Sequence, residues 1–449
     1  MEQTGQEHSS VSEAHSLVLP IMIVAGEASG DRHGAALAKA LQQIKPDLKY
    51  ELFGAGGEEM RSAGVDTLVD AREVAIIGVP EIARALGKLY RAYRALLNAA
   101  RLRRPEIVVL IDWPDFNMRL AKRLHREGFK VVYYISPQVW AWRKYRVRAL
   151  RRDIDRMLVI LPFEEKFYRN EGLEVSYVGH PLAESVRISS TREEFCARHQ
   201  LDPLRPLIAL LPGSRHKEIH YHLPAMLDAA IRLRNDRISV ELPSPGNERL
   251  SRSVASTVES QSSSLQSIGP QTAITPQFIV PLASTVRRDD VQGTIQRACL
   301  ASERNDREVK TALSVTIIEA DTYNALGHSQ FAVVASGTAT LEAAILGTPM
   351  IVVYRGSELN WRLIRPLIHL DTFGIVNLIA GKRIVPELMQ HEVTGERIAQ
   401  EVTDILSDPE RFGRMQRELA RVRDELAMNN EVSASQKAAR EVLNVAGVG

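Results

Sequence analysis

Short apolar runs rich in β-branched residues alternate with helix-forming stretches along most of this chain. The runs are almost continuously apolar, which is typical of strands in a parallel sheet that helices cover on both faces. Turns of small or polar residues separate them from the helices. The first half of the chain carries predicted strands at residues 17–26, 49–57, 106–112, 130–136, 156–162 and 175–181.

The pattern starts again in the second half. Predicted strands there are residues 206–212, 277–283, 314–320, 330–336 and 349–355, with a helix from about Ala225 after the first of them. Two repeats of strand, turn and helix predict an α/β protein with two doubly wound, Rossmann-like domains. Ligands of such sheets bind at the carboxyl ends of the strands, so we expect the two domains to face a shared cleft.

Composition suggests where the domains begin and end. We predict a disordered tail (1–17), an N-terminal domain (18–182), a C-terminal domain (183–425) and a terminal helix (426–449). Residues 243–276 are rich in Ser, Gln and Pro without periodicity, and they predict a flexible insertion in the second domain.

Bulk properties narrow the class of protein. At 449 residues, 45% hydrophobic and 25% charged, the chain is typical of a globular protein with two cores. A net charge of +2 gives no general attraction to nucleic acid. Cys196 and Cys299 stand far apart in sequence, and no apolar run is long enough to cross a membrane, so we expect a reduced, cytoplasmic protein.

The sharpest chemical pattern lies at residues 331–353. A predicted strand ends at Ser336, Gly337 and Thr338, and a helix follows, so free backbone N–H groups would attract the phosphates of a nucleotide. Glu342, one turn into the helix, would then accept hydrogen bonds from sugar hydroxyls. A nucleotide diphosphate-sugar fits this layout, and a plain helix cap is the alternative.

The turn after the first predicted strand favours a sugar over a dinucleotide. Its small residues allow a ligand to approach closely, whereas Glu27 and Asp31 would repel a pyrophosphate. The candidate acceptor contacts are Glu27, Ser29, Gly30 and Asp31. A structural role for Asp31 at the helix start is an equal alternative.

Asp112 ends a fully apolar predicted strand and would lie at the edge of the sheet that faces the cleft. A carboxylate in such a place can act as a general base that takes a proton from an acceptor hydroxyl. Asp115 is the rival, but we expect it to cap a helix that begins near Asn117. We therefore favour Asp112.

Two further turns carry candidate binding groups. Gln138 lies beside Trp140 and Trp142 after a buried strand, where the aromatic surfaces would either hold a sugar or acyl chain or pack as an aromatic corner. Ser214 and Arg215 end the first strand of the second domain, and Arg215 could neutralise a departing diphosphate.

Other polar residues of the second domain give weaker signals. His216 and His220 have helical spacing but lack a third ligand, so we expect no metal and no cofactor. Asn377 follows a short apolar run and could bond either a sugar hydroxyl or a loop carbonyl.

One predicted helix is strongly basic. Residues 84–104 hold seven cations and no acid. Such a helix can lie on an anionic membrane or bind anionic headgroups, and packing of an ordinary surface helix explains its apolar side equally well. The candidate membrane or acceptor patch is Arg84, Lys88, Arg91 and Arg94.

Taken together, the motifs GEASGD, IDWPDFN, SPQVWAWR, VGHPL, LLPGSR, ASGTATLEAAILGTPMIV and NLIAG resemble, in this order, those of the lipid-A-disaccharide synthase family. The resemblance implies an inverting GT-B-type glycosyltransferase that works without a metal or cofactor at the cytoplasmic face of a Gram-negative inner membrane. Such an enzyme transfers 2,3-diacylglucosamine from UDP to 2,3-diacylglucosamine 1-phosphate and forms the β-1,6 lipid A disaccharide.

The resemblance also implies roles for single residues. Asp112 matches the essential aspartate of the family, Arg215 the arginine of its GSR turn, and Asn377 the asparagine of its NLxAG motif. Its UDP-binding turn and helix correspond to Ser336, Gly337, Thr338 and Glu342. The partners implied are two lipid substrates and an anionic membrane surface, without nucleic acid, and a homodimer stays open.

Two rival functions remain. A UDP-sugar 2-epimerase of the same architecture would bind UDP-N-acetylglucosamine and need no lipid acceptor. A non-catalytic UDP-sugar-binding protein at the membrane would tolerate the loss of Asp112. A requirement for a second, acylated substrate separates a transferase from the epimerase.

Overall fold

The computed structural model describes residues 18–71, 82–142, 144–235, 275–283, 285–305, 313–358, 361–362, 365, 372–427 and 432–448. Two compact units make up the chain, residues 1–181 with 429–449 and residues 182–428. The predicted tail and residues 243–274 of the predicted insertion lie outside the described residues. Each unit contains one parallel sheet with helices between its strands, which confirms the predicted class of two doubly wound α/β domains.

The described residues of the N-terminal unit form a seven-stranded sheet of order β3-β2-β1-β4-β5-β6-β7. Its strands are β1 (Val18–Ala25), β2 (Lys49–Gly56), β3 (Asp66–Asp70), β4 (Ile107–Ile111), β5 (Val131–Tyr134), β6 (Arg156–Val159) and β7 (Val175–Tyr177). Its helices are α1 (Ala28–Ile44), α2 (Glu58–Ser62), α4 (Ile82–Arg103), α5 (Pro114–Arg126), α6 (Val139–Trp142), η2 (Lys144–Arg146), α7 (Val147–Asp153), α8 (Pro162–Asn170) and α19 (Ala434–Ala446). The direction of winding reverses between β1 and β4.

Helices cover both faces of this sheet. One face packs on α1 and α19 through side chains such as Leu41 and Leu443. The opposite face packs on α4, α5 and α7 through side chains such as Leu96, Leu120 and Leu150. The apolar runs of the strands are buried on both sides for this reason, as their pattern predicts.

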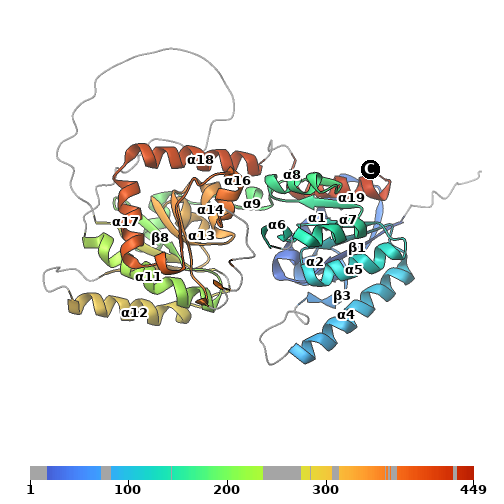
Figure 1. Cartoon of the computed structure of the whole chain (residues 1–449), viewed down its shortest axis with the longest axis horizontal. Helices are drawn as coiled ribbons and strands as arrows, with labels where there is room; N and C mark the ends of the chain where they lie inside the picture. Colours follow the sequence, from blue (N-terminus) through green and yellow to red (C-terminus); the bar gives the residue numbers. More distant parts are fainter. Residues whose placement is uncertain are drawn as a thin grey trace, which may run out of the picture. The chain divides into compact units, whose positions relative to one another are not determined.

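Helix α19 comes from the far end of the chain, yet the red helix lies among the blue and teal elements of the N-terminal unit (Figure 1). Val442 and Leu443 are buried against the sheet, and each such side chain contributes roughly 1.5–3 kcal/mol. The Arg156 guanidinium pairs with the Glu441 carboxylate at 2.8 Å. The sequence pattern predicts a terminal helix but does not indicate that it joins this unit.

The described residues of the second unit form a six-stranded sheet of order β10-β9-β8-β11-β12-β13. Its strands are β8 (Leu207–Leu211), β9 (Gln277–Pro281), β10 (Val315–Ile318), β11 (Phe331–Ala335), β12 (Met350–Tyr354) and β13 (Glu387–Met389). Its helices are α9 (Leu182–Ser185), α10 (Arg192–Arg198), α11 (His216–Asn235), α12 (Arg288–Asn305), α13 (Thr322–Gly327), α14 (Ala339–Leu346), α16 (Ile375–Ala380), η4 (Gln390–Glu392), α17 (Gly395–Leu406) and α18 (Pro409–Ala427). The winding reverses between β8 and β11.

Three elements differ from the sequence prediction. Helix α11 begins at His216 and not at about Ala225, because Pro224 lies inside the helix instead of at its start. Strands β3 and β13 were not predicted. Both lie at the edge of a sheet, and neither has a continuous apolar run: β3 is partly exposed, and β13 has three residues.

Candidate active site

Most of the predicted site residues lie in turns at the carboxyl edges of the two sheets. In the N-terminal unit, β1 and β4 are neighbours, with Ala25 paired to Ile111, so the turns that follow them lie side by side. In the second unit, β8 and β11 are neighbours, with Leu211 paired to Val334. Both pairs flank the point where the winding of the sheet reverses, which is where open α/β sheets bind their ligands.

Asp112 follows β4 directly and has an unusual backbone. Its φ is 47°, and the φ of Trp113 is 51°, so two consecutive residues occupy the left-handed region. This region costs an L residue about 1–2 kcal/mol, and such strain gathers at functional sites. Burial, and to a lesser degree the charge of Glu27, raises the pKa of the Asp112 carboxyl to about 6. The group is therefore ionised at pH 7 and still basic enough to accept a proton.

Trp113 lies over the turn after β1. A Cβ atom on Gly26 would come within 2.0 Å of its indole, so only glycine fits there. The indole stacks on Phe116 with ring centres 3.9 Å apart. The stack packs against the core between the sheet and helices α4, α5 and α7.

Asp115 does not have the capping role that the sequence suggested. Helix α5 already begins at Pro114, and Trp113 occupies its N-cap position. The Asp115 carboxylate instead pairs with the Arg146 guanidinium at 2.7 Å and is largely exposed. A paired, exposed carboxylate is a poorer base than a half-buried one, which still favours Asp112.

The predicted acceptor contacts after β1 separate into two groups. Glu27 is exposed and occupies the N-cap position of α1, and Ser29 is half-buried. Gly30 is buried, and a Cβ atom there would lie 3.2 Å from the Cβ of Ala25. Gly30 therefore lets α1 pack closely on β1, and only Glu27 and Ser29 remain accessible candidates.

Asp31 is a structural residue, which corrects its assignment as a substrate contact. Its buried carboxylate accepts backbone hydrogen bonds from Gly57 at 2.6 Å, Glu59 at 3.1 Å and Met60 at 3.1 Å. These N–H groups lie at the start of α2, so Asp31 caps that helix and not its own. With three donors on a buried carboxylate, the group is not available to a sugar.

The aromatic turn after β5 is a packed corner at Trp140. The Trp140 indole N–H donates to Glu164 Oε1 at 3.0 Å, and the Ser136 hydroxyl donates to the same oxygen at 2.5 Å. Burial raises the pKa of Glu164 to about 7. Gln138 is exposed on this corner and stays a candidate contact. The side chain of Trp142 lies outside the described residues.

The turn after β11 has the features of an anion site. The N-cap residue of α14 is Thr338, and its side chain makes no capping hydrogen bond. Within the part of the chain that the structure describes, no backbone carbonyl accepts a hydrogen bond from the N–H groups of Gly337, Thr338 and Ala339. Ser336 and Gly337 are half-buried, and a Cβ atom on Gly337 would meet only open space. Half-buried Glu342 lies one turn further, and nucleotide binding at this turn stays a prediction.

The turn after β8 is held by Glu218. Its Oε2 accepts from the backbone N–H of Ser214 at 2.8 Å and of Arg215 at 3.3 Å, and its Oε1 lies 3.1 Å from the Arg215 guanidinium. Gly213 has a φ of 123°, which favours glycine, and packs directly on this carboxylate. The Arg215 side chain is 82% exposed, so it is accessible to a ligand.

His222 has a structural role in this region that the sequence did not predict. Its Nδ1 lies 2.8 Å from Pro212 O, and its Nε2 accepts from the Arg355 backbone N–H at 2.8 Å. Burial lowers its pKa, so the ring is neutral at pH 7 and donates through Nδ1. It thus ties the turn after β8 to the segment after β12. The only sequence signal for it was its place six residues beyond His216.

Asn377 has a structural role, and its assignment as a sugar ligand is corrected. Its Nδ2 donates to Val385 O at 2.9 Å and to Glu387 Oε1 at 2.7 Å. Its Oδ1 accepts from the backbone N–H of Ile384 at 2.8 Å and of Val385 at 3.0 Å. The amide is fully buried and all of its bonds are used, so of the two predicted roles the loop contact holds.

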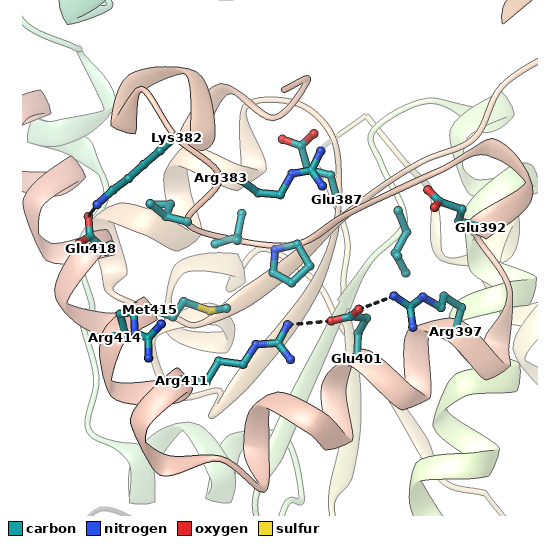
Figure 2. A pocket seen from close by; sticks show the side chains of 14 residues that line it. Lys382, Arg383, Glu387, Glu392, Arg397, Glu401, Arg411, Arg414, Met415 and Glu418 are labelled. Atoms are coloured by element: carbon teal, nitrogen blue, oxygen red, sulfur yellow. Dashed lines mark hydrogen bonds and ion pairs between the residues drawn. The ribbon is translucent and has the colours of Figure 1, made fainter. Parts of the chain in front are cut away.

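The loop that Asn377 holds forms one wall of a charged pocket of about 490 Å³, together with α17 and α18. Figure 2 shows Arg397 and Arg411 pointing to Glu401, at distances of 2.7 and 3.0 Å. These paired charges tie α17 to α18. None of the predicted site residues lines the pocket, so it is not part of the candidate active site.

Known sequences identify the family of the chain. The sequence model of the family Lipid-A-disaccharide synthetase matches residues 21–267 and 291–442. A lipid-A-disaccharide synthase of Koribacter versatilis is 41% identical over 431 residues, which cover 96% of this chain and 99% of that protein. The synthase of Geobacter metallireducens is 39% identical over 427 residues, with coverages of 95% and 97%.

Solved structures agree on the fold. The UDP-GlcNAc 2-epimerase from Neisseria meningitidis, bound to UDP-GlcNAc, has a TM-score of 0.55 at 12% identity and covers 95% of this chain and 99% of its own. The calicheamicin glycosyltransferase has a TM-score of 0.52 at 12% identity, with coverages of 96% and 98%. At this level of identity the likeness concerns the fold alone.

Proposed function

The chain belongs to the lipid-A-disaccharide synthetase family, and we propose from this premise that Asp112 and the turn after β11 are the centres of its glycosyl transfer. The enzyme is a hexosyltransferase that joins UDP-2,3-diacylglucosamine to 2,3-diacylglucosamine 1-phosphate and releases UDP. The observation in the structure that supports the site is Asp112, a strained and half-buried carboxylate at the reversal point of its sheet.

The reaction is a single displacement. Asp112 takes the proton of the acceptor 6-hydroxyl while that oxygen attacks the anomeric carbon of the donor sugar. The new C–O bond forms as the bond to the UDP oxygen breaks, and the anomeric carbon is inverted. Glu27, Ser29 and Gln138 contact the acceptor in the N-terminal unit.

The second unit holds the donor. The N–H groups of the turn 336–338 bind the diphosphate, and Glu342 accepts hydrogen bonds from the ribose hydroxyls. Arg215, which is exposed and able to fork to two oxygens, balances the charge that develops on UDP. These groups stabilise the leaving group without a metal.

An epimerase function is not favoured. Relatives of 34–41% identity over nine tenths or more of the chain are named lipid-A-disaccharide synthase. The epimerases share only 12% identity and therefore the fold. A transferase needs both substrates, whereas an epimerase needs one.

The purified full chain, assayed in EDTA with both lipid substrates, is expected to release UDP and form a disaccharide of the summed mass. Both signals should vanish when either substrate is left out, because the displacement needs donor and acceptor together. UDP release or sugar isomerisation from the donor alone would contradict a transferase.

We further propose that α4 docks the enzyme on an anionic membrane. Lys88, Arg91 and Arg94 lie exposed on this helix beside Tyr90, which is 61% exposed, and Leu102, which is 84% exposed. Among the described residues no carboxylate is recorded as pairing with these three cations. Cations beside exposed aromatic and aliphatic side chains suit the interface of a bilayer. The side chain of Arg84 lies outside the described residues, and none of the helices that the structure describes could cross a membrane.

Replacing Lys88, Arg91 and Arg94 together with glutamate is expected to weaken binding to vesicles that contain anionic lipid by 100-fold or more, since each cation near the surface contributes about 1 kcal/mol. Co-sedimentation measures this binding, and activity on detergent-dispersed substrates should be unchanged.

The matched control carries the same change of charge elsewhere on the unit. Lys39, Lys122 and Arg126 are exposed on α1 and α5, and glutamate at all three should lower vesicle binding far less. Equal losses in the two triple variants would mean that net charge, and not the α4 face, drives binding.

A further inference from the structure

The backbone of Asp112 is held by two side chains that have no assigned function. Asn117 Nδ2 donates to Ile111 O at 3.1 Å and to Asp112 O at 2.8 Å. The Tyr133 hydroxyl donates to the same Asp112 oxygen at 2.7 Å. Asn117 comes from α5 and Tyr133 from β5, so side chains of two separate elements donate hydrogen bonds to one carbonyl group.

These bonds act on a strained stretch of chain. Asp112 and Trp113 both have a left-handed φ, which L residues leave readily when nothing holds them. Asn117 and Tyr133 are both fully buried, so their donors cannot be replaced by solvent. Burial raises the pKa of the Tyr133 hydroxyl well above its ordinary value, so it remains protonated and remains a donor. The left-handed turn is therefore maintained by its neighbours.

We propose that Asn117 and Tyr133 are positioning residues, which fix the left-handed turn at Asp112 and thereby aim its carboxylate at the acceptor hydroxyl. The inference rests on the proposed role of Asp112 as base. Neither residue needs to touch a substrate. They affect the rate by fixing the direction and the depth of burial of the Asp112 carboxylate, because small errors of alignment slow a reaction strongly.

Two variants test this positioning role. Tyr133→Phe removes one O–H and little else, and Asn117→Ala removes both amide bonds. We expect kcat to fall about tenfold in the first and about 30-fold in the second, with the KM for the UDP-sugar unchanged. Asn324→Ala is the matched control, because Asn324 is a buried asparagine that bonds Ser189 and Ser190 in the other unit. It should leave kcat unchanged per folded molecule.

A pH profile separates positioning from simple loss of folded protein. The charge of Glu27 acts on Asp112, and the charges of Asp112, Asp115 and Arg146 act on Tyr133. Once the turn relaxes, the carboxyl gains water, so the acid limb of kcat should move from about pH 6 toward the ordinary value of aspartate. A merely unstable variant would keep the limb at about pH 6.

The decisive measurement repeats both changes in the Asp112→Asn background. If Asn117 and Tyr133 act through the Asp112 carboxylate, neither change lowers the residual rate further. If either change lowers the rate of Asp112→Asn by the same factor as it lowers the rate of the natural enzyme, the inference is wrong, while the role of Asp112 as base still stands. Full activity of Asp112→Asn itself would show that Asp112 is not the base, and the inference, which rests on that role, would then be wrong as well.

Discussion

Replacing Asp112 with asparagine is expected to lower kcat by about 10³-fold while UDP binds as before, because the change removes the proposed base and keeps the shape of the side chain. The side-chain donors Asn117 and Tyr133 bond the main-chain carbonyl of Asp112, which the substitution keeps, so the turn should survive. Rapid-mix measurement of disaccharide formation, together with calorimetric titration of UDP, separates chemistry from binding.

Asp115→Asn is the control for this prediction. Asp115 has the same chemistry three residues away but pairs with Arg146 at the surface, so its loss should change kcat less than threefold, within the range of a surface ion pair. The base assignment would be wrong if Asp115→Asn were the inactive variant and Asp112→Asn the active one.

The pH dependence gives the same carboxylate a second signature. The pKa of Asp112 is raised to about 6, so the group is protonated below that pH and cannot accept a proton. The rate of the natural enzyme should therefore fall about tenfold for each pH unit below 6. Ionised Asp112 also costs stability above this pKa, so any gain in melting temperature from Asp112→Asn should be larger at pH 7 than at pH 4.

Replacing Arg215 with alanine is expected to lower kcat by 10²- to 10³-fold, because this residue is the proposed partner of the charge that develops on UDP. Arg215→Lys should recover only part of the rate, since an ammonium group cannot fork to two phosphate oxygens. Steady-state kinetics with the donor varied measure both effects.

Helix α11, which begins one residue after Arg215, offers a matched control. Arg232 lies on α11 and pairs with Asp228 at 3.2 Å, much as Arg215 pairs with Glu218 at 3.1 Å. Arg232→Ala should leave kcat unchanged. If Arg215→Ala instead lowers the melting temperature and leaves kcat unchanged, the bond between Arg215 and Glu218 is structural, and Arg215 does not stabilise the leaving group.

Much of the fold could be predicted because buried parallel strands have a simple pattern. The run at 107–111 is apolar without a break, and it is a fully buried strand. The edge strand β3 carries no such signal, because it is partly exposed along its length. The order of strands, and therefore the pairing of β1 with β4, depends on contacts between distant segments and could not be found from local pattern.

The site was harder to predict for the same reason. Asp31 and Asn377 were candidate ligands, each with a structural role as an equal alternative, because polar residues that follow apolar runs often bind substrates. Whether such a residue faces a ligand or caps a neighbour depends on what lies beside it in space. The partners of Asp31 are about 26 residues away in sequence, at the start of α2. Asn117 went unnoticed because its partners are backbone carbonyls, which no sequence pattern reports.

The place of α19 has a consequence for how the protein is made. The ribosome must finish residues 182–428 before this helix emerges, which takes on the order of 10 to 50 s at ordinary rates of translation. During that time the surface of α1 and the sheet that Leu443 later covers has no partner from its own chain. The nascent N-terminal unit is therefore a natural client for a chaperone until synthesis ends.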